Sequence, residues 1–242
     1  MYREYHKWYS THLQKEIELL SFGQGGTPVL FFPTRAARFY DYENWGVIEA
    51  MREKINQGQL QVFCVDSVDG ESFYCFWCDP GEKILRHLQY EQYILHEVVP
   101  LVRQKNDSDD LIAAGCSLGA FHAINLAFRH PHLFRKVVGM SGRYDLTRQL
   151  DHYQDLFNGY WDENIYYNSP NQFLPNLYDG KLLQTMKQME IILAVGRDDP
   201  FYESTRQLSE ILWHKDIGNA FYIWDGTAHK AHYWRQMVQH YL

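Results

Sequence analysis

Short apolar runs alternate with amphipathic segments along most of the chain. Runs of four to five residues, mostly bounded by polar residues, Gly or Pro, are typical of buried parallel strands. Such runs are Val29–Phe32, Gln61–Val65, Leu111–Ala114, Lys136–Met140, Ile191–Val195 and Ala220–Trp224. Between them, apolar residues recur at helical spacing within 82–103 and 204–213. Strands separated by helices predict an α/β fold with a mostly parallel, doubly wound sheet and helices on both faces.

Two stretches depart from this alternation. Tyr5–Ser10 and Glu16–Phe22 are expected to form antiparallel edge strands ahead of the first buried strand. From about residue 144 to 185 the pattern gives way to an aromatic-rich stretch with two prolines. An insertion or cap over a site is expected there, because long loops in compact domains are usually functional. Since no repeat or linker interrupts the chain, residues 1–242 are expected to form a single domain.

The charge and composition of the chain limit the classes of molecule that it is expected to bind. The chain carries 23 Lys and Arg against 30 Asp and Glu, a formal charge of -7 without long blocks of either sign. This distribution argues against nucleic acid and anionic lipid, and no apolar run is long enough to span a membrane. A small-molecule partner is therefore expected, and four cysteines without an apolar leader favour the cytoplasm. The aromatic content of 16% indicates a lined pocket or an interface, which is compatible with a homodimer.

The sequence Gly115-Cys116-Ser117-Leu118-Gly119 matches the nucleophile-elbow pattern G-x-S-x-G. It follows a strand-like run and precedes a segment, 120–128, that is expected to be a helix. The elbow requires the two glycines because side chains beside the strained serine turn would clash. Ser117 is therefore the candidate nucleophile of a hydrolase.

A serine nucleophile needs a base and a carboxylate that orients the base. Asp198 and Asp199 follow the predicted strand 191–195, and Asp199 is favoured because a G-x-x-D turn would direct it toward the sheet. His229 follows the last predicted strand and is favoured over His232 as the base. The order Ser, Asp, His is the one in which this fold carries its triad.

With these residues in place, the chain resembles the esterase D-like family of the α/β-hydrolase superfamily, which includes S-formylglutathione hydrolases and feruloyl esterases. The resemblance covers about residues 27–242. It rests on Pro28–Pro33, Gly115–Ala120, Arg129–Phe134, Met140–Gly142, Gly196–Asp199 and His229 followed by Trp234-Arg235. The family implies an α/β-hydrolase fold with Ser117 as nucleophile, Asp199 as acid and His229 as base.

The first loop departs from the family pattern. Relatives commonly carry His-Gly after the first buried strand, where a backbone N–H completes the oxyanion hole, whereas this chain has Thr34-Arg35 after Pro33. We expect the N–H of Leu118 to supply one oxyanion donor and Thr34, or else Arg35, to supply the second. A smaller departure is Lys230-Ala231, where relatives often have Asp-Trp.

Several residues are candidates for binding the substrate. Arg35 and Arg38 could face the pocket mouth and favour an anionic substrate, although basic loop residues are usually solvated. Tyr40, with Tyr42 and Trp45, is expected to contribute to the acyl and alcohol pockets. Trp161 is expected to do so from the aromatic-rich stretch.

Other motifs receive no catalytic role. Ser141 appears exposed but lacks the second glycine of an elbow, so it is interpreted as a strand end beside the site. Cys75 and Cys78 have redox-motif spacing without the βαβ context, and two cysteines supply half a zinc site. The histidine pairs 130/132 and 229/232 lack the H-E-x-x-H pattern. No metal and no cofactor are predicted.

These observations predict a serine carboxylesterase that hydrolyses small-molecule carboxylic esters through an acyl-enzyme on Ser117. Two alternatives remain open at this point. The same triad could pass the acyl group to an alcohol, as in an acyltransferase. A scaffold with an impaired oxyanion loop could instead be a non-catalytic binding protein.

Overall fold

The chain forms one eight-stranded sheet in a computed structural model that describes residues 1–150 and 152–242. The strand order is β1-β2-β4-β3-β5-β6-β7-β8. The strands are β1 (Arg3–Ser10), β2 (Lys15–Phe22), β3 (Thr27–Phe32), β4 (Leu60–Val65), β5 (Ile112–Cys116), β6 (Lys136–Met140), β7 (Glu190–Gly196) and β8 (Ala220–Trp224). The β1–β2 and β2–β4 pairs are antiparallel and the remaining pairs are parallel. The predicted α/β class, parallel centre and antiparallel N-terminal edge are confirmed.

Helices fill the connections between the parallel strands. They are α1 (Asp41–Asn44), α2 (Val47–Ala50), α3 (Arg52–Asn56), α4 (Pro80–Tyr93), α5 (Val99–Lys105), α6 (Leu118–Arg129), α7 (Glu163–Tyr167), α8 (Pro170–Phe173), α9 (Gly180–Met186), α10 (Tyr202–His214) and α11 (Ala231–Tyr241). A π-helical stretch, η2 (Ile94–Val98), joins α4 to α5, and short 3-10 turns are η1 (Asp69–Glu71), η3 (Pro131–Leu133) and η4 (Leu174–Asn176). Asp79 and Pro80 begin α4 with a capping box in which Glu82 Oε2 accepts from the Asp79 N–H.

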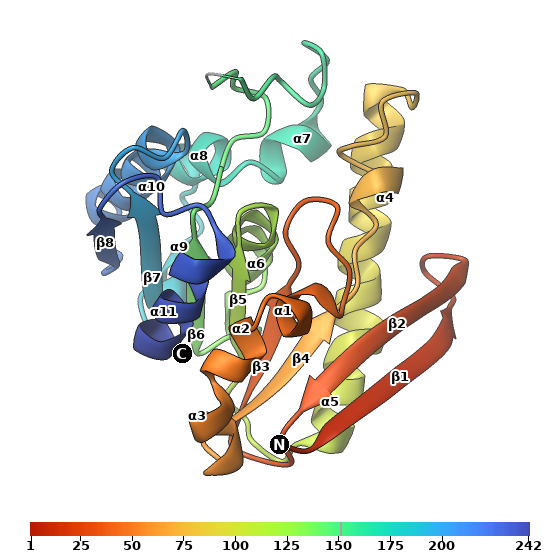
Figure 1. Cartoon of the computed structure of the whole chain (residues 1–242). Coiled ribbons are helices and arrows are strands. Elements are labelled where there is room, and N and C mark those ends of the chain that lie inside the picture. Colours follow the sequence, from red (N-terminus) through yellow and green to blue (C-terminus); the bar gives the residue numbers. More distant parts are fainter. Residues whose placement is uncertain (151) are drawn as a thin grey trace.

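Two hydrophobic clusters lie on the two faces of the sheet. One joins β-strand side chains to α4, α5, α6 and α10, and includes Leu30, Tyr93, Phe128 and Leu208. The other joins the opposite strand faces to α1, α2, α3 and α11, and includes Phe31 and Met237. Figure 1 shows α2 and α11 side by side over this second face. The central strands are therefore covered on both sides, as a doubly wound sheet requires.

The last strand differs from the prediction. β8 was expected to be a buried strand, but Tyr222 is 45% and Ile223 is 42% exposed. β8 pairs only with β7 and forms the edge of the sheet, so fewer neighbours cover its side chains. An apolar run of five residues cannot distinguish a central strand from an edge strand.

The aromatic-rich stretch 144–185 contains α7, α8, η4 and most of α9. In Figure 1 it runs over the end of the sheet at which β5 and β7 finish. A third hydrophobic cluster ties it to the helix behind Ser117, through Leu146, Phe157 and Ile165 against Leu118 and Phe121. This stretch therefore contributes walls near the carboxyl ends of the strands.

Candidate active site

Ser117 lies at the turn between β5 and α6, with φ of 57° and ψ of -119°. A side chain at either flanking glycine would collide with backbone. A Cβ on Gly115 would lie 2.2 Å from the Gly119 carbonyl carbon, and a Cβ on Gly119 would lie 2.1 Å from the Phe32 carbonyl oxygen. The Ser117 N–H donates to the Met140 carbonyl at 2.8 Å, which ties the turn to the adjacent strand. This geometry is that of the strand–turn–helix elbow.

Tyr42 stabilises this turn through two hydrogen bonds to the backbone. Its hydroxyl donates to the Phe32 carbonyl at 2.8 Å and accepts from the Cys116 N–H at 3.0 Å, so it joins the ends of β3 and β5. Tyr42 is buried, and burial raises the pKa of its hydroxyl well above the usual value. The expectation that Tyr42 lines a substrate pocket is therefore wrong.

The loops that carry Asp199 and His229 are joined to one another. Arg197 N–H donates to the Trp224 carbonyl at 2.8 Å, and Asp198 N–H donates to the Gly226 carbonyl at 3.0 Å. A Cβ on Gly196 would lie 2.2 Å from the Thr227 carbonyl oxygen, so only glycine permits this approach. The loop after β7 and the loop after β8 therefore form one unit.

Ser117, His229 and Asp199 form a continuous hydrogen-bonded chain. His229 Nε2 lies 2.9 Å from Ser117 Oγ, and His229 Nδ1 lies 2.9 Å from Asp199 Oδ2. The other carboxylate oxygen, Asp199 Oδ1, accepts from the Phe201 N–H at 2.9 Å. Asp199 is buried, whereas Asp198 and His232 are exposed and do not join this chain. The geometry thus distinguishes between neighbouring residues that the sequence left as alternatives.

Three residues of the pocket at Ser117 have backbone N–H groups that are not used within the described part of the protein. Among the described residues, none accepts a hydrogen bond from the N–H of Leu118, Thr34 or Arg35. Leu118, Thr34 and Arg35 all line a pocket of about 220 Å³ that also contains Ser117 and His229. We call it the nucleophile pocket; its other walls are Tyr74, Phe121, Arg143, Leu146, Tyr153, Phe201 and Trp234.

The loop that carries Thr34 and Arg35 is held by a buried carboxylate. Ala36 has a left-handed backbone, with φ of 57°, and its N–H donates to Asp69 Oδ2 at 2.5 Å. The Asp69 carbonyl in turn accepts from the Tyr74 N–H at 2.8 Å. Asp69 therefore fixes the backbone on two sides of the nucleophile pocket.

A second cavity, of about 300 Å³, adjoins the nucleophile pocket. We call it the outer cavity. The two share the walls Arg35, Tyr74, Arg143 and Tyr153. The guanidinium of Arg35 lies 4.5 Å from the centre of the Tyr74 ring, in a cation–π contact. Arg35 thus lines both cavities and rests on an aromatic ring that also lines both.

The other expected binding residues lie elsewhere. Arg38 pairs with Asp66 at 2.7 Å and with Glu18 at 2.9 Å, so its charge is neutralised away from the pocket mouth. Tyr40 packs against Phe39, and Trp161 packs against Tyr166; neither lines either cavity. Trp45 likewise packs against Trp234 from outside these walls.

Sequence reasoning missed Arg143. It is 4% exposed and lines both cavities, although it follows a strand end in a segment without periodicity. Its Nε and Nη2 atoms donate to the carbonyls of Asp145, Leu146, Arg148 and Gln154. Burial lowers the pKa of Arg143. The available signal in the sequence was an arginine two residues after Ser141, at the end of a predicted strand. Nothing in the sequence showed that this arginine would be buried.

Ser141 and the cysteine pair also differ from expectation. Ser141 is fully buried rather than exposed, and its hydroxyl donates to the Ala228 carbonyl at 3.2 Å, directly before His229.

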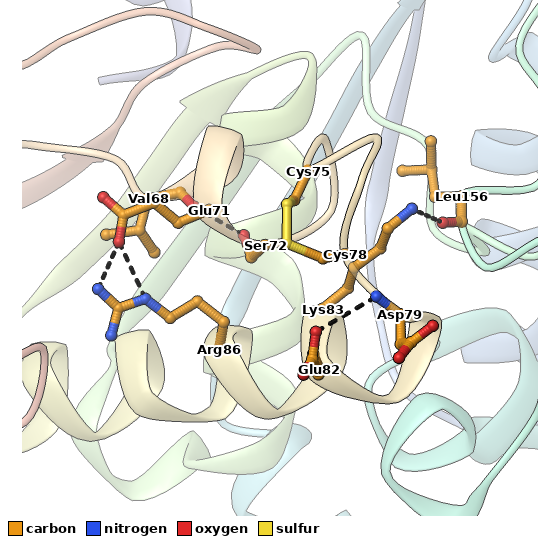
Figure 2. Close-up of a disulfide and its surroundings, with 10 residues drawn as sticks. All are labelled: Val68, Glu71, Ser72, Cys75, Cys78, Asp79, Glu82, Lys83, Arg86 and Leu156. Carbon is orange, nitrogen blue, oxygen red and sulfur yellow. Dashed lines mark hydrogen bonds and ion pairs between the residues drawn. A yellow bond between two sulfur atoms is a disulfide. The ribbon is translucent and has the colours of Figure 1, made fainter.

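Cys75 and Cys78 form a disulfide in the loop before α4 (Figure 2). Disulfides are rare in the reducing cytoplasm. Within residues 1–150 and 152–242, no group of three or more His, Cys, Asp or Glu side chains is arranged to hold a metal ion.

A family model matches the chain, and solved structures share its fold. A family model described as "Putative esterase" matches residues 42–236. A ferulic acid esterase superposes with a TM-score of 0.78 at 15% identity, covering 99% of this chain and 95% of that one. The fluorophosphonate-binding serine hydrolase F of Staphylococcus aureus gives 0.75 at 17% identity, covering 99% and 96%. An S-formylglutathione hydrolase of Agrobacterium tumefaciens gives 0.74 at 15%, covering 99% and 94%. Comparison with curated protein sequences gives no match.

The family match spans most of the chain, and the solved structures share its architecture over nearly their whole length. None of the helices among the described residues has the length and apolar character needed to cross a membrane. The chain therefore belongs to the esterase family, as a carboxylic ester hydrolase with the α/β-hydrolase fold.

Proposed function

We propose that the protein hydrolyses small carboxylic esters through an acyl-enzyme on Ser117, with His229 as general base and Asp199 as its orienting acid. The observation that carries this proposal is the pair of 2.9 Å contacts that link the serine hydroxyl to the imidazole and the imidazole to the buried carboxylate. Both distances lie within the range needed for proton transfer.

In the first half of the reaction, Ser117 Oγ attacks the ester carbonyl carbon while His229 Nε2 takes its proton. The N–H groups of Leu118 and of Thr34 or Arg35 hold the oxyanion, because no described residue competes for them. His229 then returns the proton to the departing alcohol as the ester C–O bond breaks.

In the second half, His229 removes a proton from water, and the water oxygen attacks the acyl carbonyl carbon. The bond between the acyl carbon and Ser117 Oγ then breaks, His229 returns the proton to Oγ, and the carboxylic acid leaves. Asp199 Oδ2 accepts from Nδ1 throughout and stabilises the imidazolium without changing its own charge. The apolar walls Phe121, Leu146, Phe201 and Trp234 would contact the substrate's hydrocarbon part.

The test is hydrolysis of p-nitrophenyl esters of graded acyl length by the wild type and Ser117→Ala. We expect kcat to fall by roughly 10⁴-fold or more in the variant, because the base then has no nucleophile to activate. The control is Ser108→Ala, which lies before the opposite end of β5 and should match the wild type. A fluorophosphonate should add to Ser117 in the wild type, as detected by peptide mass. Turnover that survives Ser117→Ala, or an adduct on another residue, would contradict the mechanism.

A further inference from the structure

Within residues 1–150 and 152–242, the cations on the walls of the two cavities form no ion pair with a carboxylate. The nucleophile pocket contains Arg35 and Arg143, and the outer cavity adds Lys83. The carboxylate on these walls is Asp155, whose oxygens accept from the N–H groups of Phe157 at 2.8 Å and Gly159 at 2.6 Å. Asp155 is therefore engaged with its own turn, and no ion pair joins it to Arg35, Arg143 or Lys83 among the described residues.

Arg143 is the most unusual of the three cations. It is 96% buried, and its described hydrogen-bond partners are backbone carbonyls, which carry no net charge to balance the guanidinium. Its Nη1 atom donates to none of the residues that the structure describes. The charges of Asp145 and Asp155 act on the guanidinium, but neither carboxylate forms an ion pair with it among the described residues. Burying a guanidinium without a direct ion pair is costly, and the unused Nη1 N–H groups lie on a residue that lines both cavities.

Lys83 is a second buried cation, and it lines the outer cavity. It is 4% exposed, and its Nζ donates to the Leu156 carbonyl at 3.0 Å (Figure 2). The side chain extends from α4 toward the aromatic-rich stretch, beside the loop closed by the Cys75–Cys78 disulfide. Burial lowers the pKa of this amine, while the charge of Asp155 opposes the shift.

Arg35 completes the set from the first loop. It is exposed, forms no ion pair with a described residue, and rests on Tyr74 by the cation–π contact. The flat contact with the ring positions the guanidinium while leaving its N–H groups available to a ligand. Arg35 thus provides a free fork that suits the geometry of a carboxylate, and Arg143 adds the N–H groups of its unused Nη1.

We infer that the esterase acts on esters that carry a second, anionic group, a carboxylate that binds among Arg35, Arg143 and Lys83. This inference rests on the proposed function, because it assigns the substrate class of the same site. The scissile carbonyl would lie in the nucleophile pocket at Ser117, and the carboxylate would lie at the shared wall or in the outer cavity.

The test compares charged and neutral esters of matched size. Mono-p-nitrophenyl glutarate is paired with p-nitrophenyl pentanoate, which places the charge on the acyl side. 4-Acetoxybenzoate is paired with its methyl ester, which places the charge on the leaving group. In at least one pair we expect kcat/KM for the anion to exceed that for the neutral ester by about tenfold or more, and to decline with added salt.

Variants connect this preference to the cations. Arg35→Gln and Lys83→Met should each reduce the anion-to-neutral ratio of kcat/KM several-fold, and Arg143→Gln should reduce it most, provided that its circular dichroism matches the wild type. The control is Arg52→Gln on α3, which removes the same charge from a surface ion pair with Glu49 and should leave the ratio unchanged. Equal rates for both members of both pairs, or a ratio that Arg35→Gln leaves unchanged, would overturn the inference.

A binding measurement separates this failure from failure of the mechanism. Calorimetry of glutarate with Ser117→Ala, which needs no turnover, should show binding that Arg35→Gln weakens. Neutral esters hydrolysed in a Ser117-dependent way without glutarate binding would leave the mechanism standing and refute the anion site. Glutarate binding without any turnover or phosphonate labelling would support the anion site and refute the mechanism.

Discussion

At the scale of single residues, the site depends on a backbone conformation that residues other than glycine rarely adopt. Ser117 holds a positive φ, a conformation that costs of order 1–3 kcal/mol for a non-glycine residue. The hydrogen bond to Met140 and the buried helix α6 hold it there. The strain directs the hydroxyl out of the sheet toward His229 rather than into the core.

Asp199→Asn tests the orienting carboxylate. The amide keeps the size of the side chain but can present an N–H to His229 Nδ1, which would favour the wrong imidazole tautomer. We expect kcat for p-nitrophenyl acetate to fall by roughly 10²- to 10⁴-fold with an unchanged fold. Asp198→Asn is the matched control, because Asp198 is the exposed neighbour, and it should retain wild-type kcat. A loss confined to Asp198→Asn would reverse the assignment.

Asp69→Asn tests the support of the first loop. The variant would lose the charge-assisted acceptor for the Ala36 N–H, so the Thr34 and Arg35 N–H groups should be less well positioned. We expect kcat to fall by about tenfold while KM changes little, since one oxyanion donor would be displaced rather than removed. Asp41→Asn is the control, because Asp41 accepts from the Arg38 N–H further along the same loop. If KM rises and kcat stays constant, Asp69 acts on binding instead.

At the scale of elements, the triad depends on how neighbouring strands end. The strands β5, β6, β7 and β8 are adjacent and parallel. Their carboxyl ends therefore place Ser117, Asp199 and His229 at the same end of the sheet. The strand periodicity and the elbow motif predicted this arrangement, because both depend on local sequence. The exposed position of β8 and the burial of Arg143 were not predictable, since each is decided by residues distant in the chain.

The choice between Asp198 and Asp199 shows the same limit of prediction from sequence. Asp198 and Asp199 have the same chemistry and adjacent positions, and only the three-dimensional turn directs one inward. Tyr42 shows it as well, because an aromatic residue in a site loop can line the pocket or, as here, join two strands beneath it. Side-chain direction in loops has no periodic signal in the sequence.

Gly196→Ala tests the contact between the acid and base loops. An added Cβ would lie 2.2 Å from the Thr227 carbonyl, so the loop after β7 must move away from the loop after β8. We expect kcat to fall by more than about 100-fold, because displacements near 1 Å are enough to disrupt catalytic geometry. Gly218→Ala, where a Cβ meets nothing within 4 Å, should behave as the wild type in the same assay. Full activity in Gly196→Ala would show that the two loops move independently.

At the scale of the whole molecule, buried histidines link folding to pH. His87 on α4 binds Asn168 Oδ1 at 3.0 Å, and Asn125 on α6 donates to the same oxygen at 2.8 Å. Burial lowers the pKa of His87 to about 4, and it lowers the pKa of His122 well below the usual value. Burial raises the pKa of Glu91, but the hydrogen bond from His130 and the charge of Arg129 outweigh burial and lower it to about 2. The Glu91 carboxylate is therefore protonated only at lower pH than His87.

The free energy of unfolding should therefore fall as the pH decreases from about 6.5 to 4. In this interval the unfolded chain binds a proton at His87 while the folded protein does not, which costs roughly 3 kcal/mol for this residue at the lower end. Urea unfolding at several pH values should show a shallower decline for His87→Gln than for the wild type. His240→Gln, which removes an exposed histidine, should retain the wild-type slope. Parallel slopes for all three proteins would contradict the assignment to His87.

The order of the proposed triad along the chain has a consequence for biosynthesis. Ser117 and His229 are separated by 112 positions, so the nucleophile leaves the ribosome long before its base has been translated. A nascent chain that has completed β6 contains the serine turn and the Met140 carbonyl that holds it, but lacks His229. Under the proposed mechanism, esterase activity arises only after β8 joins the edge of the sheet, and recovery of turnover would report completion of the last stage of assembly.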